Sequence, residues 1–248
     1  MKVVIDTSSL MSLVRYYLPF DKHRALYNTI KKKISEEEII IIDRVLWECE
    51  SLSDGIIIDS IAFLRDKAFL KSAKLPYKTE YLLPPDAKTL LGRLENEFVN
   101  IPIRRPLNDT QFQSRKSSFV EGADWKQIVL CLNLQSVGEA VVLVTEETER
   151  NNDNKLFQKI PVICKGVGVQ TMTLPELLQE YDIELEFIVP AAVVNPICER
   201  CLHYAQLFGS CEAFPDGDGI PKIILETNRH DKPIDGQKNE LVFSPDLT

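Results

Sequence analysis

Three short apolar runs, each followed by a segment with helical spacing, constrain the fold of this chain most strongly. The runs are Val3–Ile5, Ile39–Ile42 and Ala140–Val144, and they are apolar throughout rather than at alternate positions. Strands without a polar face are typical of parallel sheets that helices cover on both sides. Val169–Met172 predicts a short fourth strand. We therefore predict an α/β fold with three α/β/α layers, a central parallel sheet and right-handed crossovers.

Segments with helical spacing lie between these runs. The expected helices are Leu10–Tyr17, Arg24–Lys33, one that Asp43 caps, Asp59–Leu70, Lys88–Phe98, one that Asp124 opens, and Leu174–Tyr181. In the helix that Asp124 opens, apolar residues recur three and four positions apart. We therefore expect Trp125 in the core rather than as a platform for stacking nucleic-acid bases.

The character of the chain changes after about Pro190. The segment from Asn195 to Thr248 is rich in Pro, Gly, Asp and Cys and has little periodicity. We predict one domain over residues 1–187 and a small, irregular, Cys-rich C-terminal module over residues 195–248. A module this small buries little core, so a bound metal or docking on the main domain would account for its stability.

The charge balance limits the possible partners. The chain has 248 residues, a formal net charge of -8 and an isoelectric point near 5.1. This excludes a generic nucleic-acid binder, which needs clustered Lys and Arg, but it allows action on nucleic acid through metal ions or a local basic strip. We see no signal peptide and no apolar run of membrane length, and we expect a cytoplasmic protein with no membrane partner. Cys49, Cys131 and Cys164 are then expected as reduced thiols.

Acids stand where the expected strands end and the next helices begin. Asp6 follows the first strand, Glu48 lies in the helix after the second, and Asp124 begins a later helix. The pair Glu146–Glu147 follows the third strand. In open α/β sheets, ligands bind beyond the carboxyl ends of the strands, so we expect these acids in one crevice. Neighbouring carboxylates need a compensating charge, and oxygen ligands suit Mg²⁺ or Mn²⁺.

Each acid also has an ordinary structural interpretation. Asp6 could be a solvated residue at a strand end, and Asp124 could be only a helix N-cap. Glu48 could be a surface residue, with Glu50 as its competitor for the site. The pair Glu146–Glu147 could belong to an exposed acidic loop, and the choice between its two members stays open.

Four segments together resemble the PIN-domain nucleases, the fold of the ribonuclease toxins in bacterial toxin–antitoxin pairs. The matching segments are Val3–Ser8, Val45–Glu48, Ala123–Asp124 with the apolar helix behind it, and Val142–Glu147. Lys159–Cys164, with Gly166 and Val167, resembles an uncharacterised PIN-like subfamily. This chain departs from the family where Glu147 replaces the acid of a Thr-x-Asp ending. It also departs in the length of the stretch between Glu48 and Asp124.

The resemblance implies a metal-dependent endoribonuclease that is the toxin of a toxin–antitoxin pair. Its catalytic and metal-binding residues would be Asp6, Glu48, Asp124 and Glu147, around one or two Mg²⁺ or Mn²⁺ ions. Thr7 or Ser8 would support the metal or a substrate phosphate. Asp153 is a candidate outer-shell acid, although its place between asparagines also predicts a turn. The implied partners are an RNA substrate and an antitoxin protein, and a homodimer is left open.

Two other functions fit parts of this pattern. A non-catalytic protein with the PIN fold would bind nucleic acid or protein and would have acids that do not converge. A haloacid dehalogenase-type phosphatase also begins with an acid at a strand end. That chemistry needs a second Asp two residues after Asp6, where this chain has Ser8, and we exclude it on that ground.

Three short basic clusters are candidates for contacts with RNA phosphates. They are Lys31–Lys33, Arg104–Arg105 and Arg115–Lys116. The last two are the better placed, because they precede Asp124 in a loop-rich part of the chain. Charge runs this short are also typical of solvated surfaces.

The C-terminal module contains a candidate zinc site. Cys198 and Cys201 form a Cys-x2-Cys pair, His203 follows closely, and Cys211 and His230 come later. Cys-x2-Cys is typical of one half of a tetrahedral zinc site, and Cys211 with His230 could complete it. A second Cys-x2-Cys pair is missing, so reduced structural thiols are the alternative.

Overall fold

The chain divides into two compact units, Met1–Phe187 and Ile188–Thr248, and we describe each by itself. The computed structural model describes residues 1–21, 23–51, 55–149, 155–181, 183, 197–205, 210–215, 220–227, 229–235, 237 and 239–245. Asp153 and the expected boundary between the domains, at residues 187–195, lie outside these residues.

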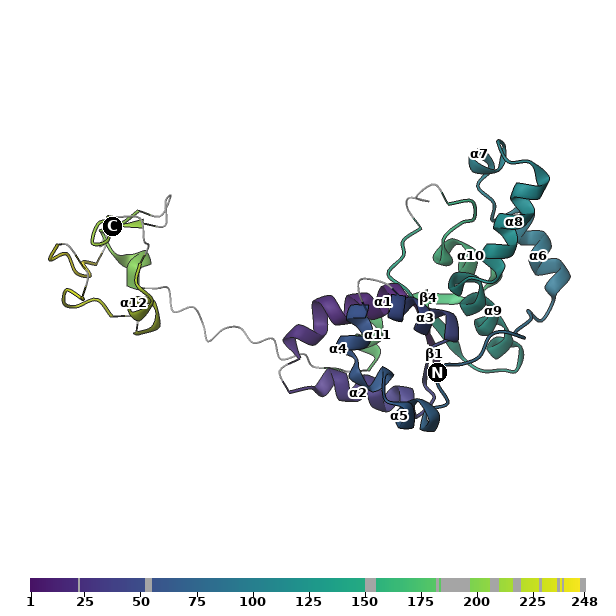
Figure 1. Cartoon of the computed structure of the whole chain (residues 1–248), viewed down its shortest axis with the longest axis horizontal. Helices are drawn as coiled ribbons and strands as arrows, with labels where there is room; N and C mark the ends of the chain where they lie inside the picture. Colours follow the sequence, from purple (N-terminus) through teal and green to yellow (C-terminus); the bar gives the residue numbers. More distant parts are fainter. Residues whose placement is uncertain are drawn as a thin grey trace. The chain divides into compact units, whose positions relative to one another are not determined.

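Four parallel strands form the centre of the first unit, in the order β2-β1-β3-β4 (Figure 1). The strands are β1 (Lys2–Ile5), β2 (Ile39–Ile40), β3 (Val141–Val144) and β4 (Gln170–Met172). All four residues of β3 are buried. Helices flank the sheet, so the predicted α/β/α fold with a parallel sheet is confirmed.

The helices of the first unit connect these strands in turn. They are α1 (Thr7–Ser12), η1 (Leu13–Tyr17), η2 (Leu18–Phe20), α2 (Ala25–Ser35), α3 (Asp43–Ser51), α4 (Ile56–Ser60), η4 (Ala62–Leu64), α5 (Lys67–Ser72), α6 (Ala87–Asn96), α7 (Ile101–Arg104), α8 (Asp109–Val120), α9 (Ala123–Ser136), α10 (Ile160–Val167) and α11 (Leu174–Glu180). In the part of the chain that is described, no helix is long and apolar enough to cross a membrane.

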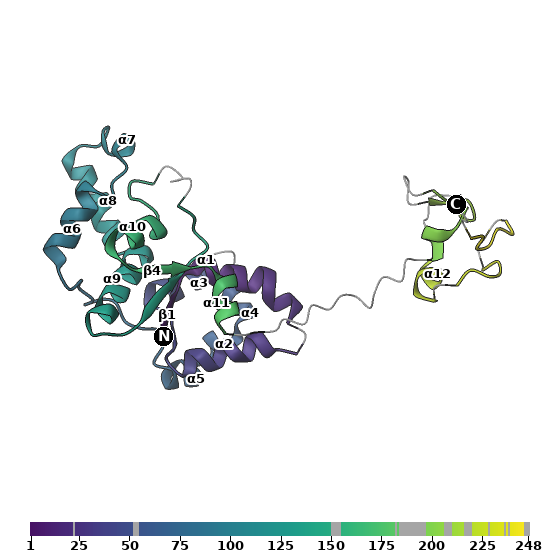
Figure 2. The ribbon, with the colours of Figure 1, turned by 180° about the vertical axis from the view of Figure 1, so that it is seen from behind.

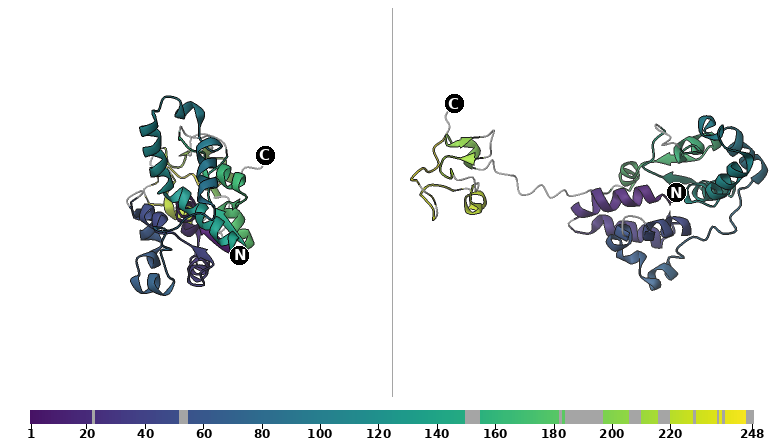
Figure 3. Two further views of the ribbon diagram at one scale, coloured as in Figure 1. Left: turned by 90° about the vertical axis from the view of Figure 1, so that its right-hand side faces the viewer. Right: turned by 45° about the horizontal axis from the view of Figure 1, so that its top comes forward.

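The direction in which the chain adds strands to the sheet reverses between β1 and β3. From β1 the chain passes through α1 and α2 to β2, and it later returns past β1 to reach β3. Figure 1 shows α2 on one side of the strands and α9 and α10 on the other, and Figure 2 and the right-hand view of Figure 3 show the same separation. The carboxyl ends of β1 and β3 therefore form the point of reversal, where open α/β sheets bind their ligands.

The burial of most helical segments follows the sequence pattern. Trp125 lies in the core with 1% of its surface exposed and packs against the ring of Phe119, so its predicted core position is confirmed. Cys49, Cys131 and Cys164 are buried free thiols, as expected. Asp124 is the second residue of α9, whose N-cap is Gly122, so the interpretation of Asp124 as an N-cap is wrong.

The helical prediction differs from the structure in several places, and α7 and α10 were not among the expected helices. The single helix expected over Asp59–Leu70 was wrong, because the chain forms α4, η4 and α5 in its place. Asp66 accepts hydrogen bonds from the backbone of Ala68 and Phe69 and thereby starts α5 as its N-cap. Helix α8 was not predicted: Phe112 is its one buried side chain, and no apolar residue stands between Phe112 and Phe119, so the sequence shows no continuous apolar stripe.

The second unit contains only short regular elements in its described residues. These are η5 (Ile197–Arg200), α12 (Lys222–Thr227) and an antiparallel pair of strands, β5 (Tyr204–Ala205) and β6 (Ser210–Cys211). The remaining described residues form turns and irregular segments, as predicted for the C-terminal module.

Candidate functional site

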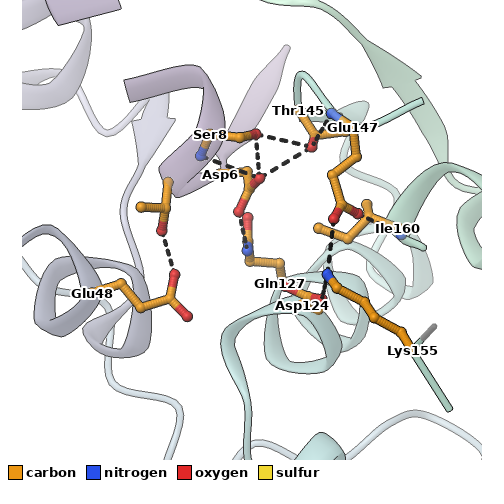
Figure 4. Close-up of polar contacts among 10 residues, drawn as sticks. Asp6, Ser8, Glu48, Asp124, Gln127, Thr145, Glu147, Lys155 and Ile160 are labelled. Atoms are coloured by element: carbon orange, nitrogen blue, oxygen red, sulfur yellow. Dashed lines mark hydrogen bonds and ion pairs between the residues drawn. The ribbon is translucent and has the colours of Figure 1, made fainter. Parts of the chain in front are cut away.

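Four carboxylates from four different elements come together at the carboxyl ends of β1 and β3. Asp6 ends β1 and caps α1, Glu48 lies on α3, and Asp124 lies in the first turn of α9. Glu147 follows β3. Figure 4 shows these side chains turned toward a common space. The structure thus brings together the four acids that the sequence singled out, at the reversal point of the sheet.

Asp6 is held rigidly by three neighbours. Its Oδ2 accepts hydrogen bonds from Ser8 Oγ at 2.5 Å and from Thr145 Oγ1 at 3.1 Å. Its Oδ1 accepts one from Gln127 Nε2 at 3.1 Å (Figure 4). Only 5% of the surface of Asp6 is exposed. Its position is therefore fixed by the chain itself, from α1, the end of β3 and α9.

Glu48, rather than Glu50, is the acid of α3 that reaches the site. Thr7 Oγ1 donates a hydrogen bond to Glu48 Oε2 at 2.5 Å, whereas Glu50 is exposed. Burial raises the pKa of Glu48 and the charge of Asp6 adds to the rise, while the hydrogen bond from Thr7 opposes it. The hydroxyls of Thr7 and Ser8, predicted to support a metal or a phosphate, thus both donate to acids of the site.

Asp124 is the most strongly perturbed acid of the site. Burial first, and then the charges of Asp6 and Glu147, raise its pKa to about 7 against the opposing effect of Lys155. Lys155 Nζ lies 3.1 Å from Glu147 Oε1 and 4.0 Å from Asp124 Oδ2. Burial together with the neighbouring carboxylates therefore favours the protonated form of Asp124, and Lys155 compensates only part of the negative charge.

The structure separates the roles of Glu146 and Glu147. Glu147 Oε2 accepts a hydrogen bond from the backbone N–H of Ile160 at 3.1 Å, at the start of α10. Glu146 Oε1 accepts one from the backbone N–H of Leu174 at 2.7 Å, at the start of α11. Glu147 also contacts Lys155 and acts on the pKa of Asp124, so Glu147 is the member of the pair that belongs to the acid cluster.

The donor set suits a hard divalent cation, since it consists of carboxylate oxygens with an excess of negative charge. Gln127 Oε1 adds a neutral oxygen that is buried without a hydrogen-bond partner. Among the residues that are described, however, no three His, Cys, Asp or Glu side chains already stand in an arrangement that could hold a metal ion. The present positions of the acids are those that their hydrogen bonds to Thr7, Ser8 and Lys155 impose.

Two residues of this site were missed by the sequence argument. Gln127 follows Asp124 by three positions, which places both on the same face of α9. The structure buries Gln127 fully. A polar residue on the face of a candidate ligand was therefore a signal that the sequence offered. Lys155 had no comparable signal, because its approach to Asp124 and Glu147 depends on the path of the chain after β3.

Most residues of the three basic clusters already contact acidic or aromatic side chains of the same chain. The ion pairs are Lys32 with Glu36, Lys33 with Glu38, Arg104 with Asp109 and Lys116 with Glu95. Lys31 lies over the rings of Phe63 and Phe69. Arg105 and Arg115 are exposed. These contacts reduce the charge that the three clusters could offer to RNA phosphates.

The cysteines of the second unit gather at one place. Cys198, Cys201 and Cys211 line a small cavity together with His230, Ile197 and Phe243. All three thiols are free. The structure therefore groups the four residues of the candidate zinc site around one space.

Comparison with known proteins assigns no activity to the chain. Residues 93–185 match a family described as a domain of unknown function (DUF4411). This span contains Asp124, Gln127 and Glu147 but not Asp6 or Glu48. No match to a curated protein or to a solved structure was found.

Proposed function

We propose that the first unit is a Mg²⁺- or Mn²⁺-dependent endoribonuclease of the PIN type, acting as the toxin of a toxin–antitoxin pair. The observation that supports this proposal is the convergence of four acids from four elements, Asp6, Glu48, Asp124 and Glu147, at the reversal point of the sheet. The resemblance of the sequence around these acids to PIN domains supplies the reaction class.

The electrostatics of the site favour a bound cation. Burial and neighbouring carboxylates raise the pKa values of Glu48 and Asp124, which means that their ionised forms are destabilised. Lys155 offers a single positive charge on one side of the cluster. A divalent cation between these carboxylates would relieve the remaining repulsion, and when bound it would supply an activated water and charge stabilisation for a phosphodiester.

The residues of the chain have distinct roles in this proposal. Asp6, Glu48, Asp124 and Glu147 would hold the cation. Thr7 and Ser8 orient two of these acids through their hydroxyls, and Gln127 fixes the second oxygen of Asp6. Lys155 brings a positive charge to the edge of the site, where it could contact a substrate phosphate.

One observation favours the alternative of a non-catalytic protein with the PIN fold that binds nucleic acid or protein. Lys155 already forms an ion pair with Glu147 and lies near Asp124, so part of the negative charge is neutralised without a metal. In that case the acid cluster would be a structural feature, and metal ions would not change what the protein does to RNA.

A cleavage assay separates the two functions. The full-length chain is incubated with a pool of labelled random-sequence RNA in EDTA, Mg²⁺ or Mn²⁺, with the corresponding DNA pool in parallel. We expect RNA cleavage only with metal and at least a hundredfold loss in the double variant Asp6→Asn, Asp124→Asn. Glu50→Gln, which alters an exposed acid on the same helix as Glu48, is the matched control and should remain active.

Three results would contradict the nuclease proposal. They are cleavage that persists in EDTA, full activity of the double variant, and absence of cleavage by the wild-type chain with either metal. The last result would establish the non-catalytic alternative. Cleavage of the DNA pool in preference to the RNA pool would contradict the proposal that RNA is the substrate.

A further inference from the structure

Potential metal ligands make up most of the buried residues that are described in the second unit. Among its described residues, the buried ones are Cys198, Cys211, Ala213, Ile224 and His230. Complete burial of an aliphatic side chain contributes about 1.5–3 kcal/mol, whereas ordering the backbone costs about 1–2 kcal/mol per residue. The two buried apolar side chains among the described residues, Ala213 and Ile224, contribute too little to offset the ordering of those residues. Small domains of this kind are commonly stabilised by disulfides, by a metal or by docking on another domain, and all cysteines of this chain are free.

The thiols and the imidazole surround a cavity suited to a single ion. The cavity has a volume of about 10 Å³, the room that one water molecule requires. The sulfur of Cys201 accepts a hydrogen bond from the backbone N–H of Ser244 at 3.5 Å, which orients it beside the cavity.

The imidazole of His230 is prepared to act as a ligand through Nδ1. Its Nε2 lies 3.0 Å from Gln237 Oε1. The amide nitrogen of Gln237 donates to the backbone carbonyl of Leu241 at 2.6 Å and to Asn239 Oδ1 at 3.3 Å, which fixes Oε1 toward the ring. Nε2 must therefore carry the hydrogen, and Nδ1 keeps its lone pair. A metal-binding His characteristically donates its other ring N–H to a fixed oxygen in this way.

The structure also selects between the two histidines of this unit. His203 is the nearer one to the Cys-x2-Cys pair in the sequence, but its Nδ1 contacts Glu212 Oε2 at 3.1 Å. His230 lines the cavity instead. His203 thus provides a control variant with the same chemistry outside the proposed ligand set.

We propose that Cys198, Cys201, Cys211 and His230 bind one structural Zn²⁺ as a tetrahedral Cys₃His site. Three thiols and one neutral imidazole are a ligand set typical of structural zinc. No three of these described side chains already stand in a coordinating arrangement, so binding would draw them toward the cavity. The three thiols would release their protons to solvent, and the binding free energy would contribute to folding of the unit. This inference does not depend on the proposed nuclease activity.

Elemental analysis of the full-length chain, purified without added metal or chelator, tests the proposal. We expect about one zinc per chain in the wild type and less than a tenth of that in Cys201→Ser and in His230→Ala. His203→Ala and Asp124→Asn should keep the full zinc content. Both tryptophans, Trp47 and Trp125, lie in the first unit, so their fluorescence verifies that this unit remains folded in every variant.

Two further measurements give the proposal independent readouts. Cobalt(II) replacing zinc should produce the intense visible absorption of a tetrahedral thiolate site, and Cys201→Ser should lose it. Titration of thiols after denaturation should find all six cysteines reduced. Absence of zinc even after incubation with ZnCl₂, zinc retained in Cys201→Ser, zinc lost in His203→Ala or Asp124→Asn, or a disulfide among these cysteines would each overturn the assignment.

Discussion

Replacing Asp124 with Asn should stabilise the metal-free protein in a pH-dependent way. The pKa of Asp124 is raised from 3.8 to about 7, through burial and the charges of Asp6 and Glu147. The unfolded chain has the ordinary Asp value. Between pH 4 and 7 the folded state therefore holds a proton that the unfolded state has lost, and the free energy of unfolding falls as the pH rises through this window.

The size of the effect follows from the same values. A tenfold change in proton affinity corresponds to about 1.4 kcal/mol, so the difference between 3.8 and about 7 is worth at most about 4 kcal/mol. The Asp124 side chain is 32% exposed, and solvent screening reduces this to about 2 kcal/mol. Asn imitates the neutral acid. The free energy of unfolding of the variant should therefore exceed that of the wild type by about 2 kcal/mol at pH 8, and by progressively less toward pH 4.

Urea unfolding in EDTA at pH 4, 6 and 8, followed by the fluorescence of the buried Trp125, measures this gain. With a slope of about 2 kcal/mol per molar urea, the midpoint of Asp124→Asn should lie about 1 M above that of the wild type at pH 8. Glu180→Gln removes an exposed acid at the end of α11 and should show no such gain. A midpoint below that of the wild type at pH 8, or an equal gain at pH 4 and pH 8, would refute the reasoning.

Two more predictions concern packing and the acid on α3. Gly166→Ala places a Cβ 2.6 Å from Phe98 Cε1 and should destabilise the protein by about 1–3 kcal/mol, whereas Gly92→Ala meets nothing within 4 Å and should stabilise it by up to about 1 kcal/mol. The urea midpoints of the two variants measure these changes, and equal shifts of the two midpoints from the wild-type value would contradict this account of the packing. Thr7→Val removes a hydrogen bond that lowers the pKa of Glu48, so that pKa should rise. The acidic limb of the nuclease pH profile should then move to higher pH, and an unchanged limb would exclude this role for Thr7.

The sheet could be predicted from the sequence because its strands carry a local signal. Val3–Ile5 and Ala140–Val144 are apolar at every position, which only a sheet covered on both sides explains simply. The position of Asp6 follows from that signal, because the acid stands directly after the strand. Helix α8 lacks such a signal, since its capping box is local but no apolar residue stands between Phe112 and Phe119.

The contacts within the site could be predicted only in part. Convergence of the acids follows from the topology of a parallel sheet, which places all strand ends at one edge. The hydrogen bond from Gln127 to Asp6 joins residues 121 positions apart, and no local pattern encodes it. The choice of Glu147 over Glu146 depended on the placement of α10 and α11, whose first N–H groups each bind one of the two acids.

Binding of Mn²⁺ tests most directly the claim that Asp6, Glu48, Asp124 and Glu147 form a cation site. Titration of the full-length chain with Mn²⁺, followed by the paramagnetic resonance signal of the free ion, should show one or two bound ions per chain. The double variant Asp6→Asn, Asp124→Asn should bind none in the same range, while Cys201→Ser should bind as the wild type does. No binding by the wild type, or equal binding by the double variant, would contradict the account.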